Sequence, residues 1–413
     1  MTAQAFADFM TESTTPYQYV DYARPRLIER GYVELSETNF PSEIPNRFFF
    51  VRDGRSIIAA DIGGYKSAVV ICAHNDSPQI KLKPTFENDK SEICTARTVN
   101  YAGGLANTWF SRDLKAAGAI IVKDEGKLKR VTFQTPKAIG FIPIQHDWTK
   151  ALQFTADREN GMNPVLGLSK SELLPYISKL IQWPISSFVS HDISLVDARP
   201  ATLINNMITS PRLDDLSSAY SCLRAFLDSK AQDTINVLAI FDSEEIGSNT
   251  HTGALSDQLN TLWKLLSTKT DIPSLKARSL LISSDAGHLQ HPNYENLGEE
   301  FHQLKPGGGI IIKVSYKASY AFDDFANVLL VEAAKRANVK YQLLAPKNGR
   351  RGGATIGPKI EANEGITTID TGVACYAMHS CRESMNVDDI DSLVELFKYV
   401  YNHFEELRVF SHM

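Results

Sequence analysis

The sequence predicts an α/β protein: a mostly parallel, mixed sheet with helices on both faces, into which a second, β-rich domain is inserted. Strand and helix patterns alternate from residue 204 to the C-terminus. The run SAVVICA at residues 67–73 is continuously apolar, as in a strand that is buried on both faces. Between these parts the pattern changes to short, charge-rich strands. We therefore expect one domain from residues 1–85 and 204–413, and an inserted domain from residues 86–203.

The N-terminal part is expected to contain two helices followed by three strands. The first helix begins after Thr2, and the second ends at Gly31, a residue type favoured just beyond helix C-termini. The turn-forming pairs Asp-Gly and Gly-Gly separate the strands. The predicted ranges are 17–30 for the second helix and 47–51, 56–61 and 67–73 for the strands.

Apolar periodicity locates the elements of the C-terminal part. In residues 215–228, apolar side chains recur every three or four positions, as in an amphipathic helix. A helix over 323–337 begins with two acids, which the helix dipole favours, and a closing helix is apolar on one side from Ile390 to Phe404. The strands expected between these helices cover residues 235–241, 279–283, 309–316, 341–344 and 367–371.

The composition excludes several classes of protein. The 413 residues include 43 Lys and Arg against 48 Asp and Glu, so there is no basic excess for binding phosphates. No apolar run approaches the roughly 20 residues of a membrane helix, and the N-terminus does not resemble a signal peptide. The five cysteines are far apart and form no CxxC pair, which favours a reducing compartment. We therefore expect a cytoplasmic protein that binds neither nucleic acid nor membrane.

Imidazole and carboxylate groups follow several of the predicted strands. This position matters because ligands of open α/β sheets bind beyond the C-terminal ends of the strands. The residues of this kind are His74, Asp76, Asp214, Asp215, Asp242, Glu244, Glu245, Asp285, His288, His291, His379 and Glu383. Imidazole and carboxylate are the usual ligands of zinc, and a zinc site with open positions is catalytic. The pattern therefore predicts a catalytic site for a pair of divalent cations.

Two pairs within this set have a further expected role. Asp76 lies two positions after His74 and can accept the second ring N–H of that histidine, which would orient it. Glu244 and Glu245 follow one strand in different directions, so that one can bind metal while the other accepts a proton from water.

Each of these residues also has a simpler interpretation. A single histidine after a strand is commonly a hydrogen-bonded loop residue, and a pair of adjacent glutamates is commonly a solvated turn. His288 and His291 are candidates for two ligands on one helix face or for a turn cap. The occurrence of such groups at the ends of four strands favours the metal site. The sequence has no GxSxG motif, and its glycine clusters match neither the P-loop nor the dinucleotide fingerprint.

Several long segments resemble the aspartyl aminopeptidase family of zinc metallopeptidases, and the resemblance covers nearly the whole chain. These segments are FADFMTESTTPYQYV, AHNDSPQIKLKP, YAGGLANTWFSRDL, RLDDLSSAY, DSEEIGS, SSDAGHLQHPNY, ATIGPKIEANEGITTIDTG and MHSCRE. The resemblance implies a metallo-exopeptidase fold with an inserted domain for dimerisation. It also implies an aminopeptidase that acts on short peptides, and a large homo-oligomer such as a tetrahedral dodecamer with an enclosed chamber.

The ligand positions of that family match five residues of this sequence. They imply two divalent cations, expected to be Zn²⁺, with Asp214 bridging both. By the same resemblance, His74 and Asp285 complete one coordination sphere, and Glu245 and His379 complete the other.

Two further residues match catalytic positions of the family. Glu244 matches the general base, and Asp76 matches the acid that orients the histidine. Two cations about 3.5–4 Å apart lower the pKa of a shared water and polarise the scissile carbonyl. Glu244 is then expected to take the proton of this water and to return it to the leaving amine.

The resemblance implies a preference for an acidic N-terminal residue, with Lys313 as the cation that faces the substrate carboxylate. The simpler interpretation of Lys313 is a solvated residue at a strand end. His146 corresponds to the histidine that the inserted domain lends to a neighbouring active site, although its flanks are altered. The sequence also departs from the family at Ala318-Ser319 and at Arg350-Arg351, where the two arginines fit either acid recognition or assembly.

Two other functions stay open on the sequence alone. One is a related binuclear hydrolase with neutral-residue specificity or N-acyl amide substrates, since the same metal set serves deacylases. The segments HPNY and TIGP argue against it. The other is a catalytically inactive, shell-forming assembly, but the five ligand positions and the base all hold residues of the right type.

Overall fold

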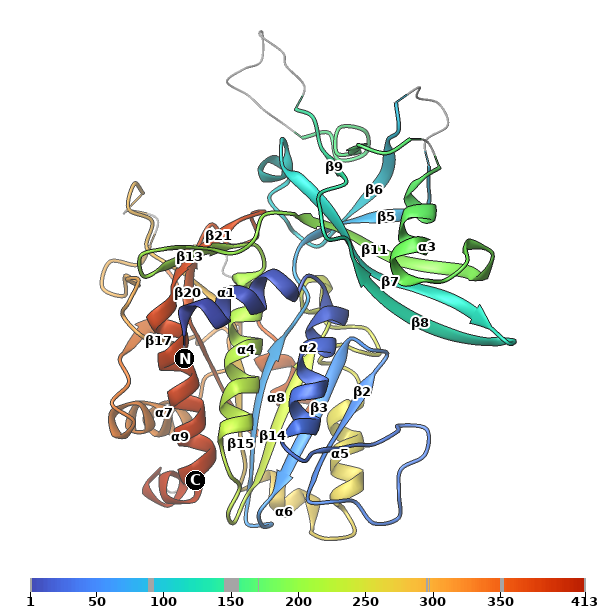
Figure 1. Cartoon of the computed structure of the whole chain (residues 1–413). Helices are drawn as coiled ribbons and strands as arrows, with labels where there is room; N and C mark the ends of the chain where they lie inside the picture. The colour runs from blue at the N-terminus through green and yellow to red at the C-terminus, as the bar shows by residue number, and fades with distance from the viewer. Residues whose placement is uncertain are drawn as a thin grey trace.

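The computed structural model describes residues 2–87, 93–144, 156–169, 171–294, 296, 298–349 and 353–411. Within this part of the chain, a central mixed sheet forms one lobe, and a separate antiparallel sheet forms a second lobe at the upper right of Figure 1. A small third sheet lies beside the central one. The predicted class, a mixed α/β sheet accompanied by a β-rich unit, is confirmed.

The central sheet positions the ends of its parallel strands at one edge. Its strand order is β1-β2-β3-β14-β4-β15-β19-β17-β18, and the neighbours β14, β4, β15 and β19 are parallel. Their carboxyl ends therefore lie side by side. The strands are β1 (Val33–Glu34), β2 (Arg47–Arg52), β3 (Ser56–Ile62), β4 (Ala68–His74), β14 (Ile235–Phe241), β15 (Leu280–Ser284), β17 (Ile310–Lys313), β18 (Tyr341–Leu344) and β19 (Thr367–Gly372).

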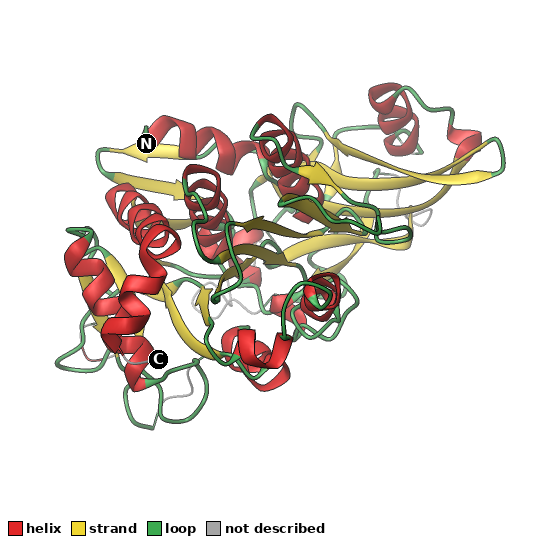
Figure 2. Ribbon diagram, turned by 90° about the horizontal axis from the view of Figure 1, so that it is seen from below, coloured by secondary structure: helices red, strands yellow, loops and turns green. Residues whose placement is uncertain are grey.

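Both faces of this sheet are covered, because successive side chains of its strands enter different cores. In β4, Val69 and Ile71 pack into one core, whereas Val70 and Cys72 pack into the other. Figure 2 shows helices on both sides of the strands. The helices that contribute to the first core are α1 (Ala3–Glu12), α2 (Pro16–Glu29), α4 (Leu213–Asp228), α7 (Asp324–Arg336) and α9 (Val387–Ser411). Those of the second core are α5 (Gln258–Leu266), α6 (Ile272–Lys276) and α8 (Gly357–Glu364).

The predicted elements of this lobe agree with the structure in most places. Thr2 caps α1 by accepting from the amide N of Ala5, and Gly31 follows α2 with a φ of +82°. The structure differs at β17, which ends at Lys313 and runs antiparallel to β19, whereas the sequence predicted a longer strand to residue 316. The helices α5, α6 and α8 were not predicted: all three are short, although α5 carries an apolar repeat at Leu259, Leu262, Trp263 and Leu266.

The second sheet has its own apolar core and an antiparallel ladder. Its order is β10-β9-β7-β11-β5-β6, and β8 also pairs with β7, along residues 117–124. It begins at Gln79 and ends at Asp197, whereas the sequence suggested boundaries at residues 86 and 203. The strands are β5 (Gln79–Glu87), β6 (Ala96–Tyr101), β7 (Asp113–Asp124), β8 (Lys127–Gln134), β9 (Gly140–Phe141), β10 (Val165–Leu166) and β11 (Phe188–Asp197), and the helix α3 (Leu173–Ile181) packs on them.

The third sheet carries the chain past the edge where the parallel strands end. Its order is β12-β13-β21-β20-β16. The strands are β12 (Thr202–Ile204), β13 (Met207–Ser210), β16 (Gly287–His288), β20 (Ala374–Tyr376) and β21 (Glu383–Asn386). None of the helices that the structure describes has the length and apolarity needed to cross a membrane.

Candidate metal centre

Three neighbouring parallel strands each lead directly into the candidate site. His74 is the last residue of β4, and it pairs with Phe241 at the end of β14. The 3₁₀ helix η3 (Glu244–Ile246) follows β14, and Asp285 follows β15. Because these strands are adjacent and parallel, their ends deliver imidazole and carboxylate groups to one place.

Asp214 lies between the two histidines of the site. Its Oδ1 is 3.6 Å from Nε2 of His74, and its Oδ2 is 3.2 Å from Nε2 of His379. Asp214 lies at the start of α4, where its backbone and that of Asp215 are not helical and the peptide bond between them is cis. Its backbone N–H donates to Oε2 of Glu383 at 2.9 Å. One carboxylate is therefore held within reach of both imidazoles.

His74, Asp214 and His379 form a row, and the two remaining acids lie at its two ends. Nε2 of His379 is 3.2 Å from Oε1 of Glu245, and Nε2 of His74 is 3.8 Å from Oδ2 of Asp285. The ligand atoms of Asp214, Glu245 and His379 all lie within 4.8 Å of one another. The structure thus brings together all five predicted ligands in the order Asp285, His74, Asp214, His379, Glu245.

The hydrogen bonding of these acids fits a cation. Within the described residues, no donor makes a well-oriented hydrogen bond to Oδ1 of Asp214 or Oε1 of Glu245, although both atoms are buried. Buried acceptors without a donor are costly unless a cation or a proton compensates them. Two imidazoles and three carboxylates are a ligand set that zinc accepts. The residues present therefore fit divalent cations.

The charges of the site shift the pKa values of its histidines upward. Burial alone would lower the pKa of His379, but the carboxylates of Asp214 and Glu245 raise it to about 11. His74 behaves in the same way: burial opposes its charge, yet Asp214 and Asp76 raise its pKa well above the ordinary value. The acids around both imidazoles therefore favour positive charge at these positions, whether a proton or a cation supplies it.

Asp76 connects His74 to the segment that carries both glutamates. Its Oδ1 is 3.3 Å from Nδ1 of His74, a ring atom that also lies 3.1 Å from the backbone oxygen of Asp76. The same carboxylate accepts the backbone N–H groups of Glu244 at 2.9 Å and Glu245 at 3.2 Å. Hydrogen bonds from these neighbours lower the pKa of Asp76 despite its burial. A charged Asp76 therefore orients the imidazole and also fixes η3.

Glu244 has an environment suited to proton transfer. It is half-buried beside its buried neighbour Glu245. Burial raises the pKa of Glu244 to about 7; His74 opposes this shift, and the carboxylates of Asp285 and Glu245 add to it. A carboxylate with a pKa near neutrality is well matched to general acid–base catalysis at neutral pH.

Lys313 is almost fully buried, in contrast to a solvated strand-end lysine. Its side chain is 1% exposed, and its Nζ donates to Oδ1 of Asp285 and to the backbone oxygen of Ala286, both at 3.1 Å. The ammonium also lies 5.1 Å from the ring centre of Tyr320. Burial opposes the charge, but Asp285 and Asp370 raise the pKa of Lys313, so that it remains a cation.

The other candidate residues do not belong to this row of ligands. His288 lies in β16 and His291 in the following turn, so the two are not on one helix face. Burial lowers the pKa of His288, which favours its neutral form. His146, Arg350 and Arg351 lie outside the described residues.

Sequence reasoning gave no role to two acids that hold the site. Oε1 of Glu383 accepts the backbone N–H of His379 at 2.7 Å while its Oε2 accepts that of Asp214. His379 has a φ of +65°, a conformation that a non-glycine residue keeps only when its surroundings enforce it. Oδ2 of the fully buried Asp215 accepts the backbone N–H of His74 at 3.4 Å. Both acids follow predicted ligands closely in sequence, and that proximity is the only signal that could have indicated their roles.

This combination of an α/β sheet with imidazole and carboxylate groups beyond its parallel strand ends is typical of a metal-dependent hydrolase. A family model described as aminopeptidase I zinc metalloprotease (M18) matches residues 9–401. The chain therefore belongs to the M18 family of zinc metallopeptidases, and it is a metallo-aminopeptidase, a hydrolase that acts on peptide bonds.

Individual relatives agree with this assignment. The aspartyl aminopeptidase of Caenorhabditis elegans is 29% identical, and the match covers 97% of this chain and 94% of the relative. The structure titled Ape4 and Nbr1 complex contains a chain with a TM-score of 0.95 and 29% identity, which covers 98% of this chain and 86% of that chain. The S. cerevisiae mApe1 dodecamer gives a TM-score of 0.87 and 25% identity, with 99% and 98% covered.

Proposed function

We propose that this aminopeptidase uses two divalent cations, expected to be Zn²⁺, which share the carboxylate of Asp214. His74 and Asp285 would complete one coordination sphere, and Glu245 and His379 the other. The observation that carries this proposal is the position of Asp214, whose two oxygens face different imidazoles at 3.6 and 3.2 Å. A single cation would not need Asp214 to face both histidines. It would also not need a further acid beyond each of them.

The cations and the side chains around them would have different roles in hydrolysis. Bound cations would polarise the scissile carbonyl and lower the pKa of a water molecule. The carboxylate of Glu244 accepts the proton of that water and later donates it to the nitrogen of the leaving amine. Asp76 keeps the imidazole of His74 oriented and holds the backbone of Glu244 in place.

Paired glutamate variants test this assignment. Glu244→Gln is expected to retain the zinc content of the parent and to lose about 10²- to 10⁴-fold in kcat, because it removes only the proton acceptor. Glu245→Gln, one residue away, is expected to lose zinc as well, because it removes a ligand charge. Zinc is measured by elemental analysis and activity with an aminoacyl naphthylamide. Parental turnover in Glu244→Gln, or equal zinc loss in both variants, would contradict the roles.

An acidic N-terminal residue is the proposed preferred substrate. Relatives with this specificity in their name match nearly the whole chain. An ammonium has three N–H donors, and within the described residues Lys313 uses two of them on Asp285 and Ala286. The third would be available to a substrate carboxylate, and the buried position would make that ion pair strong.

The preference is measured by comparing kcat/KM for Asp-, Glu- and Leu-naphthylamide. The acidic substrates are expected to be cleaved faster. Lys313→Gln is expected to reduce Asp cleavage more than Leu cleavage at equal zinc content. Faster Leu cleavage by the parent would refute the acidic preference, and an equal loss for both substrates in the variant would remove Lys313 from substrate recognition.

We also propose a cytoplasmic homo-oligomer of dodecameric size that admits short peptides. The mApe1 neighbour is a dodecamer by its title. The second sheet and its connections expose Leu128, Phe141 and Val189, which would be covered in an assembly. His146 would then serve a neighbouring active site. The five free cysteines support a reducing compartment. Sedimentation velocity at micromolar concentration tests the assembly, and a monomer there would refute it.

A further inference from the structure

Tyr101 of the second sheet contacts a residue of the metal centre directly. The hydroxyl of Tyr101 donates to Oδ2 of Asp76 at 2.8 Å. Tyr101 is the last residue of β6 and pairs with Gln79, the first residue of β5. Because β5 begins three positions after Asp76, this antiparallel register returns Tyr101 to the side of Asp76. The contact is therefore a direct result of how the inserted unit leaves and re-enters the catalytic lobe.

The segment after Tyr101 contacts the other side of the same centre. The backbone N–H of Leu105 donates to the backbone oxygen of His379 at 2.9 Å. Three residues further along, Thr108 lies within η1 (Ala106–Trp109), and its hydroxyl accepts the N–H of Cys381 at 2.8 Å. Residues 101–108 thus touch both the Asp76 segment and the loop that holds His379 in its left-handed conformation.

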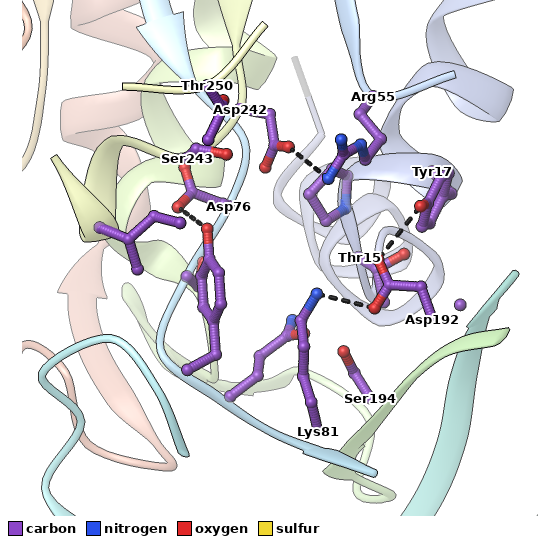
Figure 3. A pocket seen from close by; sticks show the side chains of 16 residues that line it. Thr15, Tyr17, Arg55, Asp76, Lys81, Asp192, Ser194, Asp242, Ser243 and Thr250 are labelled. Atoms are coloured by element: carbon purple, nitrogen blue, oxygen red, sulfur yellow. Dashed lines mark hydrogen bonds and ion pairs between the residues drawn. The ribbon is translucent and has the colours of Figure 1, made fainter. Parts of the chain in front are cut away.

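A cavity of about 90 Å³, lined mostly by polar residues of both lobes, lies beside Asp76 (Figure 3). None of the five predicted ligands lines it, whereas Asp76 and Tyr101 both do. Figure 3 shows Asp76 at its wall with a dashed line to its hydrogen-bond partner. On the opposite side, the hydroxyl of Tyr17 donates to Asp192 of β11 at 3.1 Å. The hydroxyl of Tyr101 thus supports Asp76 from the side of the inserted unit.

We infer that Tyr101 is a positioning residue for the metal centre, through which the inserted domain holds Asp76 and thereby His74 and the backbone of Glu245. The inference rests on the metal centre proposed above. Oδ2 of Asp76 receives two hydrogen bonds, from Tyr101 and from Glu245 N, and removal of the first leaves this oxygen with the weaker 3.2 Å contact. Groups that orient metal ligands typically change metal affinity by 10- to 100-fold when they are mutated.

The test compares Tyr101→Phe with Tyr17→Phe in the full chain. Both substitutions delete one hydroxyl from the wall of the same cavity, but only the first hydroxyl contacts Asp76. Zinc affinity is measured by competition with a chromophoric chelator, and kcat and KM are measured separately. Tyr101→Phe is expected to bind zinc about tenfold more weakly and to lose kcat at nearly constant KM, whereas Tyr17→Phe matches the parent in both.

Each result decides a different point. Parental zinc affinity in Tyr101→Phe overturns the positioning role while leaving the proposed metal centre intact. An equal loss in both variants also overturns it, because the cause would then be general loosening of the lobe interface. A parent that binds no zinc at this site would overturn the proposed function and the inference together. The thermal midpoint of each chelator-treated variant shows whether it folds before zinc is added.

Discussion

At the level of single residues, the histidines of the metal centre are shaped by the acids around them. Asp214 and Glu245 raise the pKa of His379, and Asp214 and Asp76 raise that of His74. A metal ligand must be a neutral imidazole, so each bound cation has to displace a proton. The acids therefore make the site attractive to cations and, at the same time, to protons.

Zinc binding is accordingly expected to release about two protons per chain at neutral pH. Isothermal titration calorimetry in two buffers of different ionisation enthalpy measures this number. Because the acids raise the pKa of both histidines, that of His379 to about 11, zinc affinity should rise as the pH increases through 7. His379→Ala is expected to release about one proton fewer, and binding without proton release would show that the imidazoles are already neutral.

Some residues of the site can be predicted from the sequence, and others cannot. His74, Asp214 and Asp285 stand next to apolar strand or helix patterns, and those patterns predict a shared edge. The roles of Glu383 and Tyr101 were not predicted, because Glu383 accepts from Asp214 and Tyr101 donates to Asp76, which are distant from them in sequence. Such contacts depend on strand register, which a single sequence does not specify.

At the level of elements, Asp370 of β19 ties three segments together near Lys313. Its fully buried carboxylate accepts the hydroxyls of Ser283 and Thr355 and the backbone N–H of Ala321. Burial raises the pKa of Asp370 to about 6, while Lys313 and these three donors oppose the shift. The charged form is thus tolerated only because several donors converge on it.

Asp370→Ala is expected to destabilise the fold by about 3 kcal/mol or more, because three buried donors lose their acceptor. Asp370→Asn keeps one oxygen and an amide of the same shape, so its loss should be much smaller. Urea midpoints of both variants measure the difference. Similar midpoints would show that shape, and not hydrogen bonding, holds these segments.

The same residue predicts a pH dependence. Its folded pKa of about 6 lies above the ordinary value, so the folded state binds the proton more tightly than the unfolded state. This contribution to stability is complete below about pH 4 and is lost as the pH rises through 6. Between about pH 5 and pH 7 it should fall by about 1 kcal/mol. Asp370→Asn should lack this part of the pH dependence, and identical pH profiles would contradict the shifted pKa.

Elements with strong patterns were predicted, and weaker ones were not. The continuous apolar run of β4 predicts a strand covered on both faces, and both cores contain its side chains. The strand direction of β17 could not be predicted, because antiparallel pairing with β19 leaves no trace in a strand of four residues.

At the level of the whole molecule, the metal centre joins distant parts of the chain. Its predicted ligands come from β4, the start of α4, η3, the end of β15 and the loop before β21. A cation that binds only the folded arrangement of these segments stabilises all of them together.

Zinc is therefore expected to raise the stability of the whole catalytic lobe. At free zinc about 1,000-fold above Kd, the gain should be about 4 kcal/mol. Differential scanning calorimetry with and without a chelator measures it as a change in Tm. Asp214→Asn, which removes the shared charge, should show little zinc dependence, and an equal zinc-induced shift in that variant would place the stabilising cation elsewhere.

The strand order has a consequence for synthesis of the protein. Both sheet neighbours of β4 lie beyond residue 234, whereas the second sheet is one uninterrupted stretch of chain. As the polypeptide emerges from the ribosome, the inserted unit can complete its core while β4 still lacks its partners. The apolar faces of the N-terminal strands therefore stay uncovered until the ribosome has translated β14 and β15, which lie in the second half of the chain.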